Sequence, residues 1–217
     1  MHKLTNFEKT LDDLKRAVEA SKSHASRSTR TESGPPVVTA SGHLDTTAIA
    51  FGVFTQLLAT DGIRAALYAV LRQSNYRFIS IFRFQDGQAT SVVHVDREQL
   101  AVTQVDEVPE NTTYCFFVSD DKQAFVTADA TTDERTQDHV ARDTVQSYCG
   151  IPILEPEGGL IGVLCHHDVV PRDPEQLNLE LLVQVSSALG QSGLVPDYPD
   201  LRELVTSQTK NPPMVDA

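Results

Sequence analysis

Residues 147–154, SYCGIPIL, and residues 160–166, LIGVLCH, are two β-strand patterns separated by the turn-forming run 156–159, PEGG. This arrangement predicts an antiparallel hairpin. Pro152 removes a backbone donor from the first strand, which is typical of a sheet edge or the rim of a pocket. Gly162 lies inside the second strand, where a missing side chain allows another backbone to approach closely.

A second hairpin is predicted upstream, from residues 78–84, FISIFRF, and 90–95, TSVVHV, joined through Asp86-Gly87. Two helices precede it. The first is capped by Asp45 or Thr46 and carries Ile49, Val53, Phe54, Leu57 and Leu58, and the second is capped by Asp61. A third strand is expected over residues 100–105, a short helix over residues 112–119 and another strand over residues 123–127.

The last predicted helix has the clearest start signal of the chain. Asp173 is its expected N-cap, Pro174 suits the first helical position, and Gln176 completes a capping box. Gly190 is its expected end. Before it, residues 129–146 are polar and irregular, and a segment of that length in a compact domain usually has a function, such as covering a site.

The ends of the chain differ from its centre. Residues 4–22 predict a helix with an apolar stripe at heptad spacing, formed by Leu4, Phe7, Leu11, Leu14 and Val18. The stripe must pack either on its own domain or on the same helix of a second chain. We therefore expect a helix and flexible linker in residues 1–43, one folded domain in residues 44–190 and a tail in residues 191–217.

Composition excludes several classes of partner. The formal net charge is −12 and the sequence pI is about 4.9, with no cluster of Lys and Arg, so direct nucleic-acid binding is not expected. No apolar run approaches the ~20 residues of a membrane span, and the first residues lack a secretory signal pattern. The three cysteines have no zinc-type spacing, and we expect a cytoplasmic, reduced environment.

Several motifs, in order, resemble the GAF domain family. They are Gly150-Ile-Pro-Ile, then Gly162-Val-Leu-Cys with Asp168, then Pro171-Arg172, then Leu179-Glu-Leu-Leu. Upstream, residues 128–135, ADATTDER, look like the crossover motif of that family. The resemblance covers residues 44–190. It implies an α+β fold of the PAS/GAF/profilin type: a six-stranded antiparallel sheet of order 2-1-5-4-3-6, flanked by helices, with a ligand cavity under the crossover.

The resemblance also implies a sensory function, since GAF domains bind cyclic nucleotides, bilins, haem, amino acids or ions, and many dimerise through flanking helices. The N-K…F…D-E set of cyclic-nucleotide binders is missing from this chain. Cys165-His166 lies on the wrong strand for bilin attachment. Free methionine sulfoxide reductases of this family cluster three cysteines around the crossover, whereas here only Cys115 coincides with one of them.

The residue types and their positions give a set of candidate ligand contacts: Tyr114, Cys115, Tyr148, Arg135, His139, His94 and Asp129. Arg135 could clamp an anion, and Asp129 could instead cap the following turn. Side chains alternate along a strand, so only one of Tyr148 and Cys149 can face the cavity, and we favour Tyr148. Cys165 and His167 share one strand face and are the candidates for a metal.

We therefore expect a small-molecule sensor that signals through protein–protein contact, as a homodimer through its helices or with a signalling partner, and that catalyses nothing itself. Two alternatives stay open. One is a redox enzyme like the free methionine sulfoxide reductases. The other is a haem- or metal-bound sensor that uses His94, His139 or Cys165. The sequence names no particular ligand or cofactor.

Overall fold

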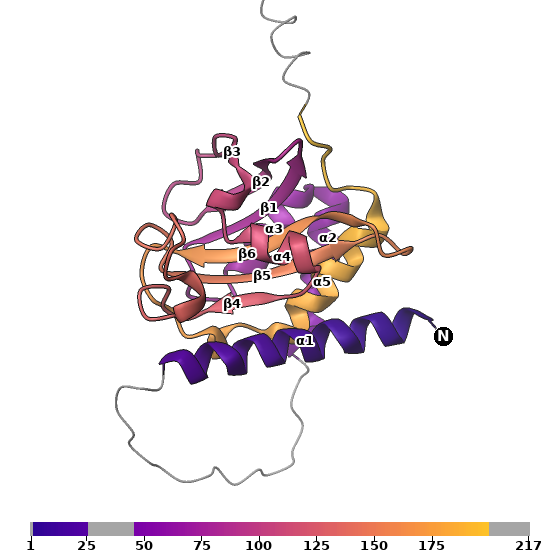
Figure 1. The fold of residues 1–217 in the computed structure, drawn as a ribbon. Helices are drawn as coiled ribbons and strands as arrows, with labels where there is room; N and C mark the ends of the chain where they lie inside the picture. The colour runs from indigo at the N-terminus through magenta and orange to yellow at the C-terminus, as the bar shows by residue number, and fades with distance from the viewer. Residues whose placement is uncertain (1, 26–45, 200–217) are drawn as a thin grey trace, which may run out of the picture.

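The computed structural model describes residues 2–25 and 46–199, so the predicted linker and the end of the predicted tail lie almost wholly outside the described residues. The described chain is a six-stranded antiparallel sheet with helices on both faces (Figure 1). The sheet order is β3-β2-β1-β6-β5-β4. The predicted α+β fold is confirmed.

Two long hairpins form the centre of the sheet. β1 (Phe78–Gln85) pairs with β2 (Gln88–Asp96), and β5 (Ser147–Leu154) pairs with β6 (Leu160–Asp168). β1 also pairs with β6, which joins the hairpins. Asp86 and Gly87 both have positive φ, 52° and 77°, as a tight turn between right-twisted strands requires. Both predicted hairpins are confirmed.

The edges of the sheet differ from the expected order. β4 (Phe125–Thr127) pairs with β5 at one edge, and β3 (Val108–Pro109) pairs with β2 at the other. In the expected order a sixth strand lies beside the third strand, a position that corresponds to β4 here. Here the long helix α1 (His2–Ala25) packs beside β4 instead, as Figure 1 shows. Helix α1 therefore protects the free edge of β4, and Ala128 N–H, just after this strand, donates to Ser21 Oγ (2.8 Å).

One face of the sheet packs on α2 (Thr46–Thr60), α3 (Ile63–Leu71) and α5 (Leu179–Ser192). The main core lies between them and includes Leu67, Ile81 and Leu181, all buried. Leu14 and Val18 of α1 belong to this core and Leu11 packs against it, so this part of the predicted apolar stripe packs on its own domain. The predicted helix over residues 4–22 is confirmed.

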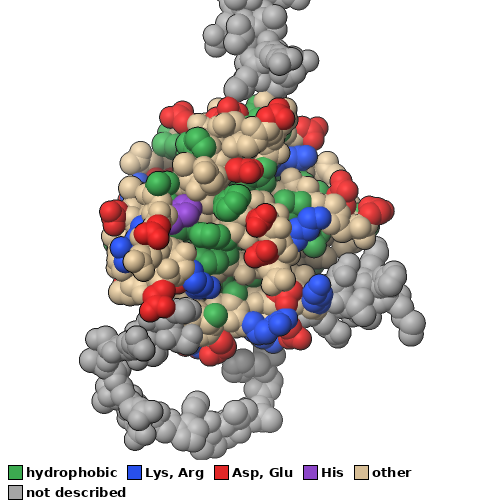
Figure 2. All heavy atoms as spheres, viewed as in Figure 1, with side chains coloured by type: hydrophobic (Ala, Val, Ile, Leu, Met, Phe, Trp, Pro, Cys, Tyr) green, Lys and Arg blue, Asp and Glu red, His purple; other side chains and the backbone are tan. Residues whose placement is uncertain are grey.

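The opposite face is covered by less regular chain. The short turn η1 (Glu110–Thr112), the helix α4 (Cys115–Asp121) and the crossover, residues 128–146, cover it, and the crossover contains one turn, η2 (Glu134–Thr136). A second apolar cluster, with Phe82, Tyr114 and Tyr148, lies beneath them. Figure 2 shows apolar side chains gathered at the centre of this face.

Four predictions of local structure were wrong, two in the first half of the chain and two at the last helix. Residues 100–105 form no strand, because Arg64 donates to the carbonyl oxygens of Leu100 (2.6 Å) and Val102 (3.3 Å) in place of a neighbouring strand. Asp61 caps no helix, since Gly62 with φ 86° is the N-cap of α3 and no side chain caps it.

The last helix also begins later than predicted. Asp173 caps the short turn η3 (Pro174–Gln176), and Asn178 caps α5 by accepting from Leu181 N–H (3.0 Å). The chain is extended at Leu177, between the two. Helix α5 runs past Gly190 and ends before Gly193, which has φ 65°.

Charged pairs tie the strand ends together. Arg77 makes two hydrogen bonds to the Asp96 carboxylate (3.0 and 2.7 Å), which lowers the pKa of Asp96. Asp168 accepts from the backbone of Arg77 (2.9 Å) and from Arg172 Nε (2.8 Å). The aspartate and arginine of the sequence motif thus hold β1, β6 and the following loop.

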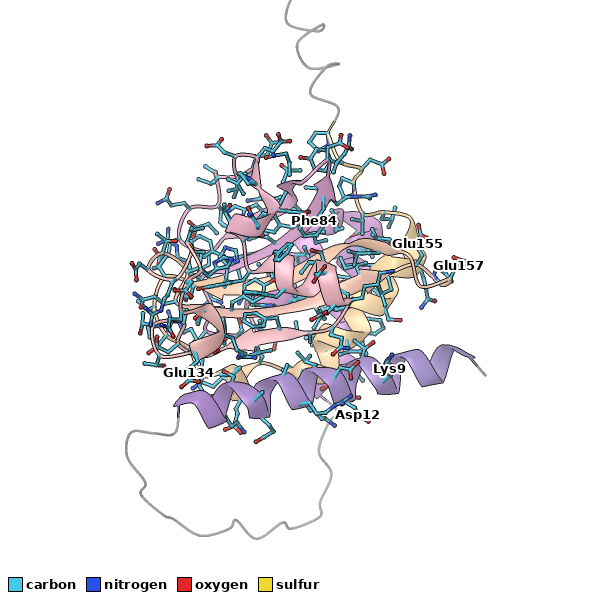
Figure 3. All side chains as sticks on the ribbon, in the orientation of Figure 1. Lys9, Asp12, Phe84, Glu134, Glu155 and Glu157 are labelled. Atoms are coloured by element: carbon cyan, nitrogen blue, oxygen red, sulfur yellow. The ribbon has the colours of Figure 1, made fainter. Side chains whose placement is uncertain are left out.

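At the opposite end of the sheet from Glu134, Figure 3 shows Glu155 and Glu157 at the β5–β6 turn.

A matched pair of glycine substitutions tests the packing of α5 on the sheet. A Cβ on Gly190 would lie 2.1 Å from the carbonyl oxygen of Leu154, so we expect Gly190→Ala to lower the free energy of unfolding by about 1–3 kcal/mol. A Cβ on Gly52 of α2 meets nothing within 4 Å, so Gly52→Ala should raise it by up to about 1 kcal/mol. Urea denaturation measures both, and equal effects would contradict this packing.

Candidate functional site

A cavity of about 430 Å³ lies between the sheet and the irregular cover of its second face. Its walls come from β1, β5, β6, the start of α4, the loop before β3 and the crossover. The lining residues are Phe82, Val105, Val108, Thr112, Thr113, Tyr114, Cys115, Val140, Ala141, Thr144, Val145, Tyr148, Cys165 and His167. Val140 is 71% exposed and Val105 39% exposed, so the cavity reaches the surface between them.

The sheet contributes side chains to this cavity by strict alternation. Tyr148, Cys165 and His167 face it, while Cys149 and Leu164 lie in the main core on the other face. Among the candidates of the sequence analysis, Tyr114, Cys115 and Tyr148 come together at this wall, and so do Cys165 and His167. The predicted alternation of Tyr148 and Cys149 is confirmed, although their role toward a ligand stays a prediction.

Sulfur and hydroxyl groups meet at one point of the wall. Tyr148 Oη donates to Cys115 Sγ (3.2 Å), and Cys115 Sγ lies 3.9 Å from Cys165 Sγ. Cys165 Sγ is also 3.9 Å from His167 Nδ1. Burial raises the pKa of Tyr148 and of Cys165 well above their ordinary values. Tyr148 and Cys165 therefore carry their protons at pH 7.

The cavity carries no fixed charge among its lining residues. The lining contains no Asp, Glu, Lys or Arg, and burial lowers the pKa of its one histidine, His167, to about 3, so this imidazole is neutral at pH 7. The Tyr114 phenol is likewise neutral, because burial raises its pKa to about 12. The polar groups on offer are hydroxyls, thiols and one neutral imidazole.

The predicted anion clamp is used elsewhere. Arg135 forms a bidentate pair with Asp133 (3.0 and 2.6 Å), donates to the Val126 carbonyl (2.6 Å) and packs over the Phe125 ring. Asp129 accepts from the backbone and hydroxyl of Thr131 and so caps the turn. Neither residue lines the cavity, because each is engaged in holding the crossover.

The two other predicted contacts also lie outside the lining. The His139 ring packs against Tyr114, with ring centroids 4.5 Å apart, and its Nδ1 accepts from Ala141 N–H. His94 Nδ1 lies 2.9 Å from Ser80 Oγ, and its ring stacks on Phe78. His139 thus packs against the lining residue Tyr114, and His94 lies beside the lining residue His167. Burial lowers the pKa of each histidine.

Of the residues considered for a haem or metal ion, Cys165 and His167 line the cavity, whereas His94 and His139 do not. Within residues 2–25 and 46–199, no group of three or more His, Cys, Asp or Glu side chains could hold a metal ion. Sequence reasoning missed Thr112, Thr113 and Ala141, because small polar and apolar residues in loops carry no distinctive signal.

Solved structures share this architecture. The GAF domain of a phosphoenolpyruvate-protein phosphotransferase from Acinetobacter superposes with a TM-score of 0.56 at 12% identity, over 76% of this chain and 99% of that one. The fold is the GAF fold. The phycoerythrobilin-bound GAF domain of a cyanobacterial phytochrome has a TM-score of 0.52 at 17% identity, over 68% of this chain and 96% of that one.

A GAF-fold enzyme is also similar. The free methionine-R-sulfoxide reductase of Neisseria meningitidis, solved in complex with its substrate, has a TM-score of 0.52 at 13% identity, over 69% of this chain and 90% of that one. No family model matches the sequence, and no curated protein matches it. At these identities the likeness shows the GAF fold alone. In the described part of the chain no helix is long and apolar enough to cross a membrane.

His166, behind the cavity wall, makes stability depend on pH. Burial lowers its pKa to about 3, against 6.5 for an ordinary histidine. The unfolded chain therefore takes up this proton first, and stability that is complete above pH 6.5 falls progressively toward pH 3. We expect His166→Phe to reduce the slope of unfolding free energy between pH 6 and pH 5 by up to about 1.4 kcal/mol per pH unit.

Urea denaturation across this pH range measures the slope. The matched control is Tyr76→Phe, because Tyr76 stacks edge-on with His166 in the same core but does not titrate there. Its slope should equal that of the unchanged protein. An unaltered slope in His166→Phe would show that this imidazole is not held neutral by the fold.

Proposed function

We propose that this protein is a sensory GAF domain that binds an uncharged, mostly apolar small molecule in the cavity beneath its crossover. The observation that carries the proposal is a cavity of about 430 Å³ whose lining contains no Asp, Glu, Lys or Arg and whose one histidine is neutral at pH 7. A charged guest would leave water without gaining a partner of opposite sign, which is costly. An apolar guest would replace water against Phe82, Val108 and Val145.

Polar groups at the wall would orient such a guest. The hydroxyls of Thr112 and Thr113 donate to the carbonyls of Pro109 and Glu110, so their oxygens can accept from a guest, and neutral His167 offers a further hydrogen bond without charge. A molecule with one or two carbonyl, hydroxyl or amine groups on an apolar frame fits this chemistry. Exposed Val105 and Val140 at the mouth would meet an apolar molecule as it enters.

The fold offers a route from the cavity to a partner. Ala141 and Val145 of the crossover line the cavity, and the crossover begins at Ala128, whose N–H donates to Ser21 of α1. Helix α1 packs in turn on α5. We propose that a guest changes the position of the crossover and, through α1 and α5, contact with a second copy of the chain or a signalling protein. Such a switch requires different affinities for the two states.

We propose no catalytic step here. Free methionine sulfoxide, the substrate of the similar reductases, carries an ammonium and a carboxylate group. The lining residues of this cavity supply no charged side chain to pair with either. A coupled assay with free methionine sulfoxide tests this point, and turnover that is lost in Cys115→Ser would establish the redox enzyme instead.

Binding of 1-aminoanthracene, a neutral fluorescent molecule with an apolar frame, tests the proposed function. We expect its fluorescence to rise on binding, and its saturation to raise the unfolding free energy by about 2.7 kcal/mol at 100 times its Kd. Anthracene-2-carboxylate has a similar frame with a negative charge and should bind at least tenfold more weakly. Equal or tighter binding of the carboxylate would contradict an uncharged guest.

A pair of substitutions places the probe in the cavity. Ala141→Phe adds a ring to the cavity wall and should abolish binding, whereas Ala59→Phe adds the same ring to an exposed position of α2, far from the lining. Far-ultraviolet circular dichroism should show both variants folded. Binding that survives Ala141→Phe would place the probe elsewhere.

A further inference from the structure

Two of the three cysteines meet at the cavity although they are 50 residues apart in the chain. Cys115 is the first residue of α4, and Cys165 lies in the middle of β6. Their sulfur atoms are 3.9 Å apart, and both line the cavity that opens between Val105 and Val140. The pair is therefore in contact and reachable from solvent through that opening, while both residues are otherwise buried.

We propose that Cys115 and Cys165 form a reversible redox pair, whose disulfide is made by a peroxide entering the cavity and changes what the cavity can hold. The function is distinct from binding a guest, since it senses an oxidant by a covalent step. Its effect on the guest rests on the proposed function, whereas the disulfide itself does not.

The surroundings assign a role to each sulfur. The Tyr148 hydroxyl donates to Cys115 Sγ at 3.2 Å, a contact that stabilises a thiolate on Cys115 once its proton leaves. Cys165 is enclosed by sheet and helix and accepts from Cys115 Sγ, and burial raises its pKa well above the ordinary value. Cys115 is therefore the attacking thiol and Cys165 the resolving thiol.

The chemistry needs one oxidant and releases two simple products. Cys115 loses its proton, and the thiolate attacks the terminal oxygen of a hydroperoxide, so that the O–O bond breaks and Cys115 becomes a sulfenic acid. The leaving oxygen takes up the proton that Cys115 lost and departs as an alcohol or, from hydrogen peroxide, as water. The Cys165 sulfur then attacks Cys115 Sγ, the S–O bond breaks, and the hydroxide leaves as water with the Cys165 proton. A thiol reductant reverses the step by exchange.

The disulfide would reshape the cavity wall. An S–S bond is about 2.05 Å long, so the sulfurs must approach by nearly half of their present 3.9 Å separation. Helix α4 and β6 carry them, and Tyr114, directly before α4, is part of the same wall. Closing the bond draws the start of α4 toward β6 and narrows the space between them.

The third cysteine is a matched internal control. Cys149 is also buried, but it lies in the main core on the opposite face of β5 and does not line the cavity. Burial raises its pKa to about 12. A peroxide in the cavity should therefore leave Cys149 reduced.

The test treats the full chain with hydrogen peroxide, alkylates remaining thiols in denaturant and maps the peptides by mass spectrometry. We expect the intact mass before alkylation to fall by two hydrogen atoms, with peptides of Cys115 and Cys165 linked and Cys149 alkylated. Cys149→Ala should keep the link, and Cys115→Ala and Cys165→Ala should lose it. Circular dichroism and Cys→Ser versions of both variants separate loss of the pair from loss of the fold.

Three results would overturn the pair: all thiols still free, a link to Cys149, or links only between chains. The coupling is tested with 1-aminoanthracene, whose affinity for the oxidised protein should be at least threefold lower than for the reduced protein. A mapped Cys115–Cys165 link with unchanged probe affinity would overturn the coupling. Absence of probe binding to the reduced protein would count against the proposed function, while the peptide map still decides the pair.

Discussion

The crossover has almost no regular secondary structure, yet it covers an apolar sheet face, and its buried backbone groups need partners. Side chains supply them. Arg135 donates to the Val126 carbonyl while Asp133 holds its guanidinium, and Arg142 Nε and Thr136 donate to the Ala130 carbonyl. Arg135, Asp133 and Arg142 are thus committed to backbone carbonyls and to each other, and the lining of the cavity beneath has hydroxyls, thiols and apolar surface but no Asp, Glu, Lys or Arg.

Along β5 and β6, successive side chains point alternately into the cavity and into the main core. Cys165 and His167 reach the cavity, while Cys149, Leu164 and His166 join the helix-packed core. A shift of register by one residue would exchange these sets, placing His166 and Cys149 at the cavity and Tyr148 in the core. The close approach of β6 to the Phe82 carbonyl at Gly162, where a Cβ would lie 2.4 Å from that oxygen, favours the observed register.

Sequence alone predicted most of the fold, since both hairpins combine period-two patterns with specific turn residues, and α1 has a regular apolar stripe. It failed where one local signal competes with another. Asp173 has every feature of a helix cap, but Asn178 takes that role because the chain between them is extended. At the site, alternation correctly predicted Tyr148, whereas Arg135 was assigned to a ligand although Asp133, two residues earlier, is its partner. Residue type cannot tell an arginine committed to its own loop from one that is available.

The similar solved structures share a fold but differ in what they hold, a bilin in one and a sulfoxide substrate in another. The GAF scaffold supplies a sheet and a covered face, and the cover decides the chemistry. In this chain the cover contributes Val140, Ala141, Thr144 and Val145 to the cavity wall. Its arginines Arg135 and Arg142 donate to backbone carbonyls and do not line the cavity. The same cover begins at Ala128, which is hydrogen-bonded to α1. Under the proposed function, a guest that presses on the crossover would therefore act on the segment that is hydrogen-bonded to the N-terminal helix, so the proposed binding and the proposed output would involve the same segment.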